Sequence, residues 1–214
     1  MKAAIFDVDG TLLDSMGLWK NIGSDYLRAL GITPREGLSE VLKTMSMHQA
    51  AAYYQDEYGL TLSAAEIIAD VTVMIERYYK DEVQLKAGVF NFLTLLHRKG
   101  IRMCIATASG AALVESALQR LEVSRFFPRI FTCESVGHGK DKPLIYEEAS
   151  AFLQTEKSAT IVFEDALYAM KTAKAAGFRV AAVYDKYECE QNEVQALADY
   201  YMRDFDEAAA VLFS

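Results

Sequence analysis

The sequence predicts an α/β protein with a doubly wound, Rossmann-like parallel sheet and a helical domain inserted into it. Two observations predict the sheet: short apolar runs recur along the chain, and helix-like segments separate them. A third observation predicts the insertion. Residues 15–83 show helical periodicity and contain no strand-like run, although strands alternate with helices elsewhere.

The expected strands are short and apolar on both faces, as buried parallel strands are. They are Lys2–Val8, Ile101–Ala106, Arg129–Thr132, Thr160–Phe163 and Arg179–Val183. A last, shorter strand is expected at Asp199–Met202, followed by a helix at Glu207–Phe213.

Helices are expected between the strands, where apolar residues recur at spacings of three and four. One covers Val89–Leu96 and ends at Gly100, and another covers Leu113–Leu121. A third covers Ala166–Ala176 and ends at Gly177, a residue type that commonly follows the last helical turn.

The inserted segment carries four helical patterns, at about residues 18–30, 41–45, 50–58 and 67–79. Helices at this point cannot lie within the sheet, so we expect a separate four-helix cap above the strand ends. Residues 1–14 and 86–214 then form the core, and residues 15–85 form the cap. A mobile lid is the main hypothesis for the cap, and a static subdomain is the alternative.

Composition narrows the class of protein. A net charge of −8 and a pI near 5.0 argue against nucleic acid and anionic membranes as main partners. No apolar stretch approaches the roughly 18 residues of a membrane span, and no secretory signal is recognised before Asp7. Cys104, Cys133 and Cys189 are widely spaced, which favours reduced thiols. We expect a cytoplasmic protein, monomeric by default.

Two carboxylates follow the first expected strand directly. Asp7 and Asp9 would emerge at the rim of the sheet, where open α/β folds bind ligands. Such a pair could hold a hard cation, supply a nucleophile and transfer a proton. A polar strand exit and a fragment of a calcium loop are the alternatives.

Polar residues follow the next two strands as well. Thr107 and Ser109 come where a helix begins and could bind phosphate oxygens, or they could simply cap that helix, which is the role we expect for Ser109. The loop at residues 134–143 carries Lys140 and Lys142, either of which could neutralise a phosphoryl group. The alternative is that these lysines are solvated.

Glu164 and Asp165 follow the fourth strand, where consecutive acids are costly unless they meet a cation. They could instead cap the helix that follows. Taken together, the strand ends supply acids, a hydroxyl and a lysine at one edge of a sheet, which predicts a magnesium-assisted phosphoryl-transfer site.

The four strand ends resemble the motifs of the haloacid dehalogenase superfamily of phosphohydrolases, and the resemblance covers nearly the whole chain. The matching motifs are Asp7-Val8-Asp9-Gly10-Thr11 with Asp14-Ser15, Thr107, Lys140 with Pro143, and Glu164-Asp165 through Ala176-Gly177. Lys142 fits less well than Lys140, because Pro143 would follow it too early. The insertion resembles the family's α-helical cap of the first type.

The resemblance implies a role for each matching residue. Asp7 would be the nucleophile that becomes an aspartyl-phosphate, and Asp9 the general acid and base. Thr107 and Lys140 would bind the phosphoryl oxygens. Mg²⁺ would be held by Asp7, by the backbone carbonyl of Asp9 and by Asp165, with Glu164 acting through water.

The resemblance further implies a small phosphomonoester as substrate, either a sugar phosphate or a nucleotide monophosphate. The family's β-phosphoglucomutases carry an arginine in the cap for a second phosphate, but this chain has methionine in the comparable stretch, Lys43–His48. Lys43 or His48 could substitute, so a mutase is the alternative. A catalytically idle binding module is a third hypothesis, which Asp9 argues against. The cap aromatics could stack on a substrate ring, but core packing is expected for them: Trp19, Tyr26, Tyr53, Tyr54, Tyr58, Tyr78 and Tyr79.

Overall fold

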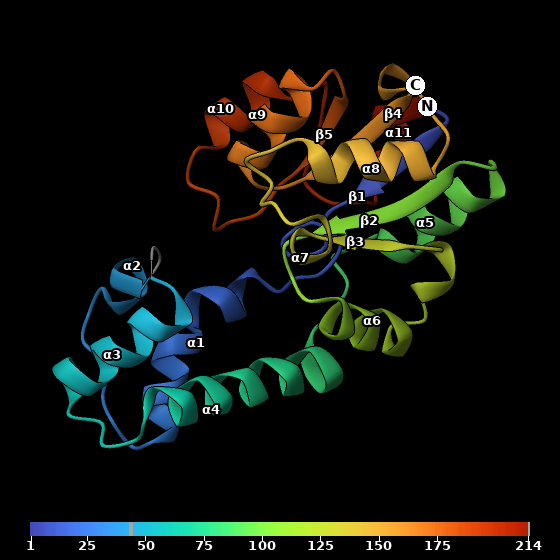
Figure 1. Cartoon of the computed structure of the whole chain (residues 1–214). Helices are drawn as coiled ribbons and strands as arrows, with labels where there is room; N and C mark the ends of the chain where they lie inside the picture. The colour runs from blue at the N-terminus through green and yellow to red at the C-terminus, as the bar shows by residue number, and fades with distance from the viewer. Residues whose placement is uncertain (43–44, 214) are drawn as a thin grey trace. The chain divides into compact units, whose positions relative to one another are not determined.

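The computed structural model describes residues 1–42 and 45–213. The chain forms two compact units, one of Met1–Ser15 with Val83–Ser214 and the other of Met16–Glu82 (Figure 1). Among the described residues, no helix is both long enough and apolar enough to span a bilayer.

The first unit, called the core unit below, is built on a parallel sheet with the order β3-β2-β1-β4-β5-β6. The strands are β1 (Ala3–Phe6), β2 (Arg102–Thr107), β3 (Ile130–Thr132), β4 (Thr160–Glu164), β5 (Arg179–Val183) and β6 (Tyr200–Met202). The chain runs outward from β1 to β3 and then crosses to β4 on the other side of β1. This reversal makes the sheet doubly wound, as predicted, and it places a ligand-binding edge at the carboxyl ends of β1 and β4.

The central strands end level with one another. Phe6 of β1 pairs with Ile105 of β2 and with Phe163 of β4. The residues that follow therefore arrive at one edge of the sheet, and Asp7 comes to lie beside Glu164.

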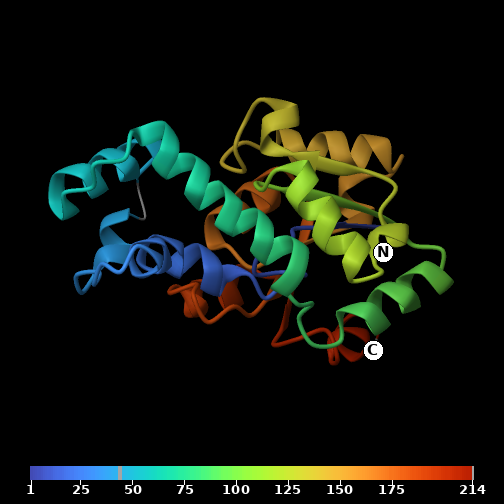
Figure 2. The same cartoon turned by 90° about the horizontal axis from the view of Figure 1, so that it is seen from below.

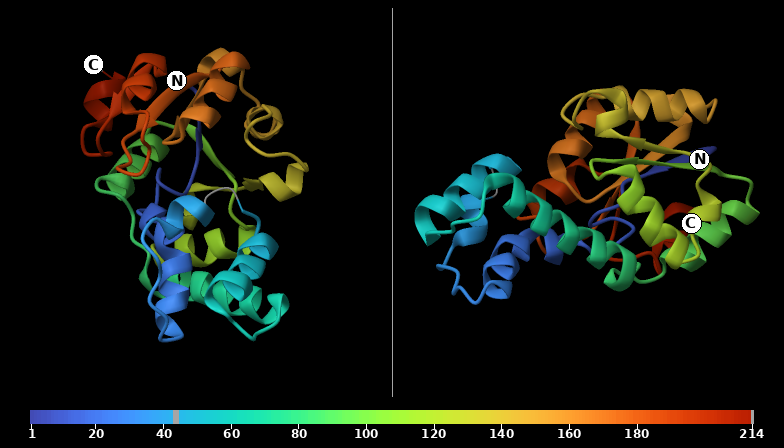
Figure 3. Two further views of the ribbon diagram at one scale, coloured as in Figure 1. Left: turned by 90° about the vertical axis from the view of Figure 1, so that its left-hand side faces the viewer. Right: turned by 60° about the horizontal axis from the view of Figure 1, so that its bottom comes forward.

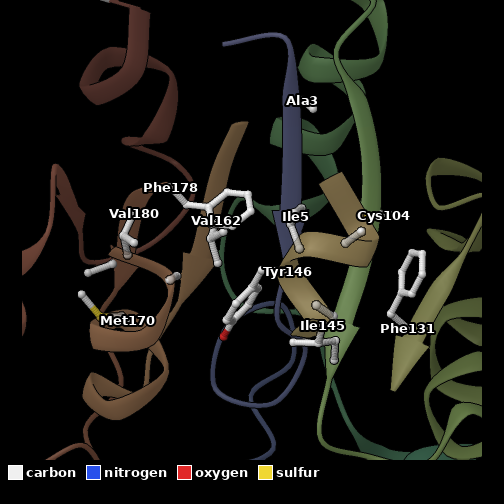
Figure 4. Close-up of a cluster of buried hydrophobic side chains, with 14 of the residues drawn as sticks. Ala3, Ile5, Cys104, Phe131, Ile145, Tyr146, Val162, Met170, Phe178 and Val180 are labelled. Carbon is white, nitrogen blue, oxygen red and sulfur yellow. The ribbon is translucent and has the colours of Figure 1, made fainter. Parts of the chain in front are cut away.

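Helices cover both faces of this sheet (Figure 2). On one face, α8 (Leu144–Phe152), α9 (Leu167–Ala175) and α10 (Gln191–Leu197) contribute to a buried cluster with Ile5 and Val162 (Figure 4). On the other, α5 (Val89–Arg98) contributes Phe92, which packs against the Phe6 and Phe163 rings. Further helices of this unit are α6 (Ala111–Arg120), α7 (Cys133–Val136) and α11 (Ala208–Phe213), with short 3-10 turns at Ser124–Phe126 and Lys157–Ala159.

The second unit, called the helical unit below, contains no strand in residues 16–42 and 45–82 (Figure 3). Its helices are α1 (Met16–Ala29), α2 (Leu38–Leu42), α3 (Met47–Tyr58) and α4 (Ala64–Arg77), and a π-helical turn at Tyr78–Glu82 continues α4. Ser46 and Gln49 form a capping box, which starts α3 three residues before the apolar pattern begins.

Aromatic side chains form much of the interior of the helical unit. Tyr26, Tyr54 and Tyr79 are buried, and the Tyr26 and Tyr54 ring centroids are 5.8 Å apart. The indole of Trp19 donates a hydrogen bond of 3.0 Å to the Tyr79 hydroxyl. These three tyrosines therefore pack in the interior, as expected.

The two ends of the core unit's interrupted chain are paired backbone to backbone. Leu13 forms an antiparallel bridge with Leu85, and the Asp14 amide donates to the Gln84 carbonyl at 3.0 Å. The Lys86 amide donates to the Leu12 carbonyl at 2.9 Å. The chain therefore leaves the core unit and returns to it at one place.

Candidate active site

The turn after β1 delivers Asp7 to the edge of the sheet. The amides of Leu12 and Leu13 both donate to the Val8 carbonyl, at 2.9 and 2.8 Å, and so fold the chain back on itself. Gly10 adopts φ of +83° within this turn, a conformation that residues with a side chain rarely adopt. The Asp-Gly-Thr sequence thus forms a tight loop directly beside the Asp7 carboxylate.

Lys140 lies inside this edge of the sheet. Its ammonium donates to Asp7 Oδ1 and, at 2.5 Å, to Glu164 Oε1, and its side chain is 3% exposed. Burial opposes the charge on Lys140, but the carboxylates of Asp7 and Glu164 outweigh it and raise the Lys140 pKa well above its usual value. Lys142 is exposed. Of the two candidate lysines, the structure brings Lys140 to the acids.

Three buried carboxylates gather around this ammonium. Asp7, Glu164 and Asp165 each offer one oxygen within 4.8 Å of the others. Burial, opposed by Lys140 and reinforced by Glu164, raises the Asp7 pKa to about 7. Burial and the charges of Asp7 and Glu164 raise the Asp165 pKa well above its usual value. The Thr11 hydroxyl donates to Asp165 Oδ1 at 3.2 Å.

This acidic cluster fits a hard divalent cation. Its ligands would be carboxylate oxygens, which Mg²⁺ and Ca²⁺ prefer. Three buried acids with a single lysine among them also leave negative charge that burial makes costly, and a bound cation would relieve that cost. The residues present therefore fit a metal ion, held by carboxylate oxygens of Asp7, Glu164 and Asp165.

Two serine hydroxyl groups hold the Asp9 carboxylate. Ser15 donates to Asp9 Oδ1 at 2.7 Å, and Ser109 donates to Asp9 Oδ2 at 2.6 Å. The expectation that Ser109 caps the next helix is wrong: α6 has Gly110 at its N-cap and no side-chain cap. The Ser109 hydroxyl instead donates to the charged Asp9 carboxylate, and hydrogen bonds to an ionised group are among the stronger ones.

Thr107, the other residue predicted to bind phosphate, lies next to Ser109. Thr107 is fully buried at the end of β2, and its hydroxyl accepts from the Ser109 amide at 3.0 Å. The capping alternative for Glu164 and Asp165 also fails, because α9 has Ala166 at its N-cap and no side-chain cap. In the helical unit, His48 is exposed, and Lys43 lies outside the described residues.

Some contacts of the site were not predicted from the sequence. Thr11 and Ser15 lie within the first motif, but the motif does not indicate that they bind Asp165 and Asp9. The Tyr146 hydroxyl donates to Glu164 Oε1 at 3.0 Å. Its position in α8 follows the apolar helical pattern, which gives no sign of a polar contact.

Comparison with known proteins agrees with this geometry. Residues 4–183 match the profile of the haloacid dehalogenase-like hydrolases. The chain belongs to this family. Hexitol phosphatase B of Escherichia coli K12 is 26% identical over 210 residues, which cover 97% of this chain and 94% of that protein. The protein is therefore a hydrolase of the haloacid dehalogenase family.

Solved structures share the whole fold. A Thermotoga maritima protein described as a candidate beta-phosphoglucomutase has a TM-score of 0.86 at 22% identity, covering 99% of this chain and 98% of its own. CbbY from Rhodobacter sphaeroides, in complex with xylulose-(1,5)bisphosphate, has a TM-score of 0.77 at 25% identity, covering 97% and 96%. At 22% identity, the similarity to the Thermotoga maritima protein shows a shared fold and nothing about the reaction.

Proposed function

We propose that this protein is a magnesium-dependent phosphatase that hydrolyses a phosphorylated carbohydrate through an aspartyl-phosphate. The family makes the chain a hydrolase, and its relatives include phosphatases, so its reaction class is phosphoric monoester hydrolysis. One observation supports the mechanism above all: buried Lys140 contacts Asp7, while Asp9 is held separately by two hydroxyls. Asp7 thus lies beside a cation that can neutralise a phosphoryl group, and Asp9 is oriented for proton transfer.

In the first step, a carboxylate oxygen of Asp7 attacks phosphorus, and the bond from phosphorus to the leaving oxygen breaks. Asp9 donates a proton to that leaving oxygen, and the alcohol departs. Lys140, which is charged because of its raised pKa, neutralises the phosphoryl oxygens as negative charge builds up on them. Thr107 adds a hydroxyl donor to the same oxygens.

In the second step, Asp9 takes a proton from a water molecule that attacks the phosphorus of the aspartyl-phosphate. The bond from phosphorus to the Asp7 oxygen breaks, inorganic phosphate leaves, and the Asp7 carboxylate is restored. Asp9 therefore returns to its starting protonation state over one turnover.

The residues that would hold Mg²⁺ are Asp7, the backbone carbonyl of Asp9 and Asp165, with Glu164 contributing through water. A bound Mg²⁺ would supply Lewis-acid stabilisation of charge on the phosphoryl oxygens and would offset the repulsion among the buried acids.

The proposed substrate is a small phosphorylated sugar or sugar alcohol. A curated relative of 26% identity acts on hexitol phosphates by its name, and the CbbY structure holds a sugar bisphosphate. We propose that the helical unit acts as the cap that selects among such substrates. The similarity to a mutase-like structure at 22% identity carries no argument for a mutase reaction.

The test is hydrolysis of p-nitrophenyl phosphate and a panel of sugar phosphates with Mg²⁺ present or chelated. We expect Mg²⁺-dependent release of phosphate that Asp7→Asn abolishes, with sugar phosphates preferred over nucleotide monophosphates. No turnover across the panel would refute the enzyme assignment. Conversion of β-glucose 1-phosphate to glucose 6-phosphate faster than phosphate release would favour the mutase.

We further propose a cytoplasmic location and a monomeric state. The thiols of Cys104, Cys133 and Cys189 are free in the structure, as a reducing compartment would require. Cell fractionation and sedimentation of the purified protein test these two statements.

A further inference from the structure

We propose that Tyr146 is a positioning residue of this site, whose hydroxyl fixes the Glu164 carboxylate that holds Lys140 against Asp7. The inference deepens the proposed function and rests on it, because it assigns Lys140 to phosphate binding. The hydroxyl of Tyr146 contacts Glu164 and is not assigned to the phosphoryl group. It acts through Glu164.

The hydrogen bonds converge on a single oxygen. Glu164 Oε1 accepts from Lys140 Nζ at 2.5 Å and from the Tyr146 hydroxyl at 3.0 Å. The other oxygen, Oε2, accepts from the Ala166 amide at 3.5 Å, a longer contact. Glu164 is 1% exposed. With both donors on Oε1, the carboxylate is held in one orientation by Tyr146 on one side and by Lys140 on the other.

The rest of the Tyr146 side chain belongs to the apolar core. Its ring lies in the buried cluster with Ile5 and Val162 (Figure 4), and its hydroxyl reaches Glu164 at the end of β4. The Tyr146 and Phe178 ring centroids are 6.2 Å apart at 60°. Phenylalanine would keep this packing and remove only the hydroxyl. The substitution therefore separates the polar role from the structural one.

The hydrogen bond from Tyr146 to Glu164 matters because the Lys140 ammonium contacts two acids, Asp7 and Glu164. During the proposed reaction Asp7 accepts a phosphoryl group, so the Lys140 ammonium must stay in place while its partner changes. Glu164 provides the second, unchanging partner. Without the Tyr146 hydroxyl, Glu164 can rotate within its buried site, and Lys140 follows it away from Asp7. Removing such an outer hydrogen-bond partner typically costs about tenfold or more in activity or ligand affinity.

The experiment compares wild type with Tyr146→Phe in the presence of Mg²⁺. We expect kcat/KM for p-nitrophenyl phosphate to fall about tenfold, and the affinity for inorganic phosphate, measured by calorimetry, to fall by a similar factor. The matched control is Tyr200→Phe. Its hydroxyl accepts from Arg179 Nη1 at 3.2 Å, where β6 begins, at the edge opposite the acids. This control should leave both quantities within about twofold of wild type.

A double-mutant cycle with Lys140→Ala shows whether the effect travels through the lysine. If it does, Tyr146→Phe should lower phosphate affinity little further once Lys140 is absent. Equal losses in both backgrounds, or wild-type values in Tyr146→Phe with an unchanged melting curve, would overturn the inference. Absence of turnover in the wild type would instead overturn the proposed function. The phosphate-binding comparison needs no turnover and would still decide the role of Tyr146.

Discussion

At the scale of single residues, the Asp9 carboxylate shows how the site prepares a proton transfer. Ser15, which follows β1, and Ser109, which follows β2, donate to its two oxygens at 2.7 and 2.6 Å. A carboxylate held this way cannot turn freely toward or away from a leaving oxygen. The benefit should be largest for substrates whose leaving group needs a proton.

Ser109→Ala tests this reasoning. We expect kcat/KM for a hexitol phosphate to fall about tenfold, because its leaving oxygen must receive a proton so that the group departs as an alcohol. For p-nitrophenyl phosphate, kcat/KM should fall less than about threefold, because p-nitrophenolate leaves unprotonated. Ser150→Ala is the control, since its hydroxyl donates to the Thr155 carbonyl away from Asp9. Equal losses for both substrates would show that Ser109 does not act through Asp9.

Asp7 gives a prediction about pH and stability in the metal-free protein. Burial raises its pKa to about 7, so the folded state binds this proton more tightly than the unfolded chain does. The contribution of Asp7 to the free energy of unfolding is therefore fully present below the ordinary value of 3.8 and is lost as the pH rises through about 7.

Asp7→Asn removes this dependence. With metal chelated, the free energy of unfolding of wild type should fall by about 2 kcal/mol relative to that of the variant as the pH rises from about 5 to about 8. Each pKa unit corresponds to about 1.4 kcal/mol. Urea denaturation of both proteins at several pH values measures this difference in the free energy of unfolding. Adding Mg²⁺ should narrow the difference, since wild type gains a bound cation. A difference that does not vary with pH would contradict the burial argument.

At the scale of elements, the two ends of α5 make a matched pair of glycines. Gly88 precedes the helix with φ of +76°, and Gly100 follows it with φ of +69°. A Cβ at Gly88 would lie 2.2 Å from the Asp206 amide nitrogen, whereas a Cβ at Gly100 meets nothing within 4 Å. Both positions are strained for a side chain, but only Gly88 is also blocked by backbone.

Gly100→Ala should therefore cost about 1 kcal/mol, the backbone strain alone. Gly88→Ala should cost about 3 kcal/mol or more, because the segment at Asp206 must move as well. Chemical denaturation of the two variants under identical conditions provides the comparison. Similar costs for both would mean that the contact near Asp206 yields easily.

The elements also show which sequence signals were informative. Buried strands such as β4 and β5 were predictable because their apolar runs are continuous. The helix α10 was not, since among its residues only Val194 is buried and no apolar period results. In the site, Lys140 could be selected over Lys142 by the position of Pro143. The hydroxyl groups that bind Asp9 and Glu164 could not be predicted, because no sequence pattern indicates which acceptor a serine or tyrosine hydroxyl will find.

At the scale of the whole molecule, the connections of the helical unit indicate that the core unit can fold without it. The chain leaves and re-enters through paired backbone: Leu13 bridges Leu85, and Asp14 and Gln84 share a hydrogen bond of 3.0 Å. Antiparallel segments of this kind can be joined by a turn of about two to four residues. The core unit also contains Asp7, Asp9, Lys140 and Asp165, the residues proposed to carry the chemistry.

Replacing residues 16–82 by a short glycine-containing turn should therefore leave a folded core unit. We expect it to hydrolyse p-nitrophenyl phosphate, because the proposed machinery is complete without the helical unit. We also expect it to lose preference among sugar phosphates, because the helical unit that we propose selects among them would be missing. Circular dichroism and kcat/KM across the sugar phosphate panel test these expectations, with Asp7→Asn in the same shortened chain as the control for contaminating phosphatase. A folded core that keeps the preferences of the full chain would place specificity in the core unit, and an unfolded one would show that the helical unit is needed for stability.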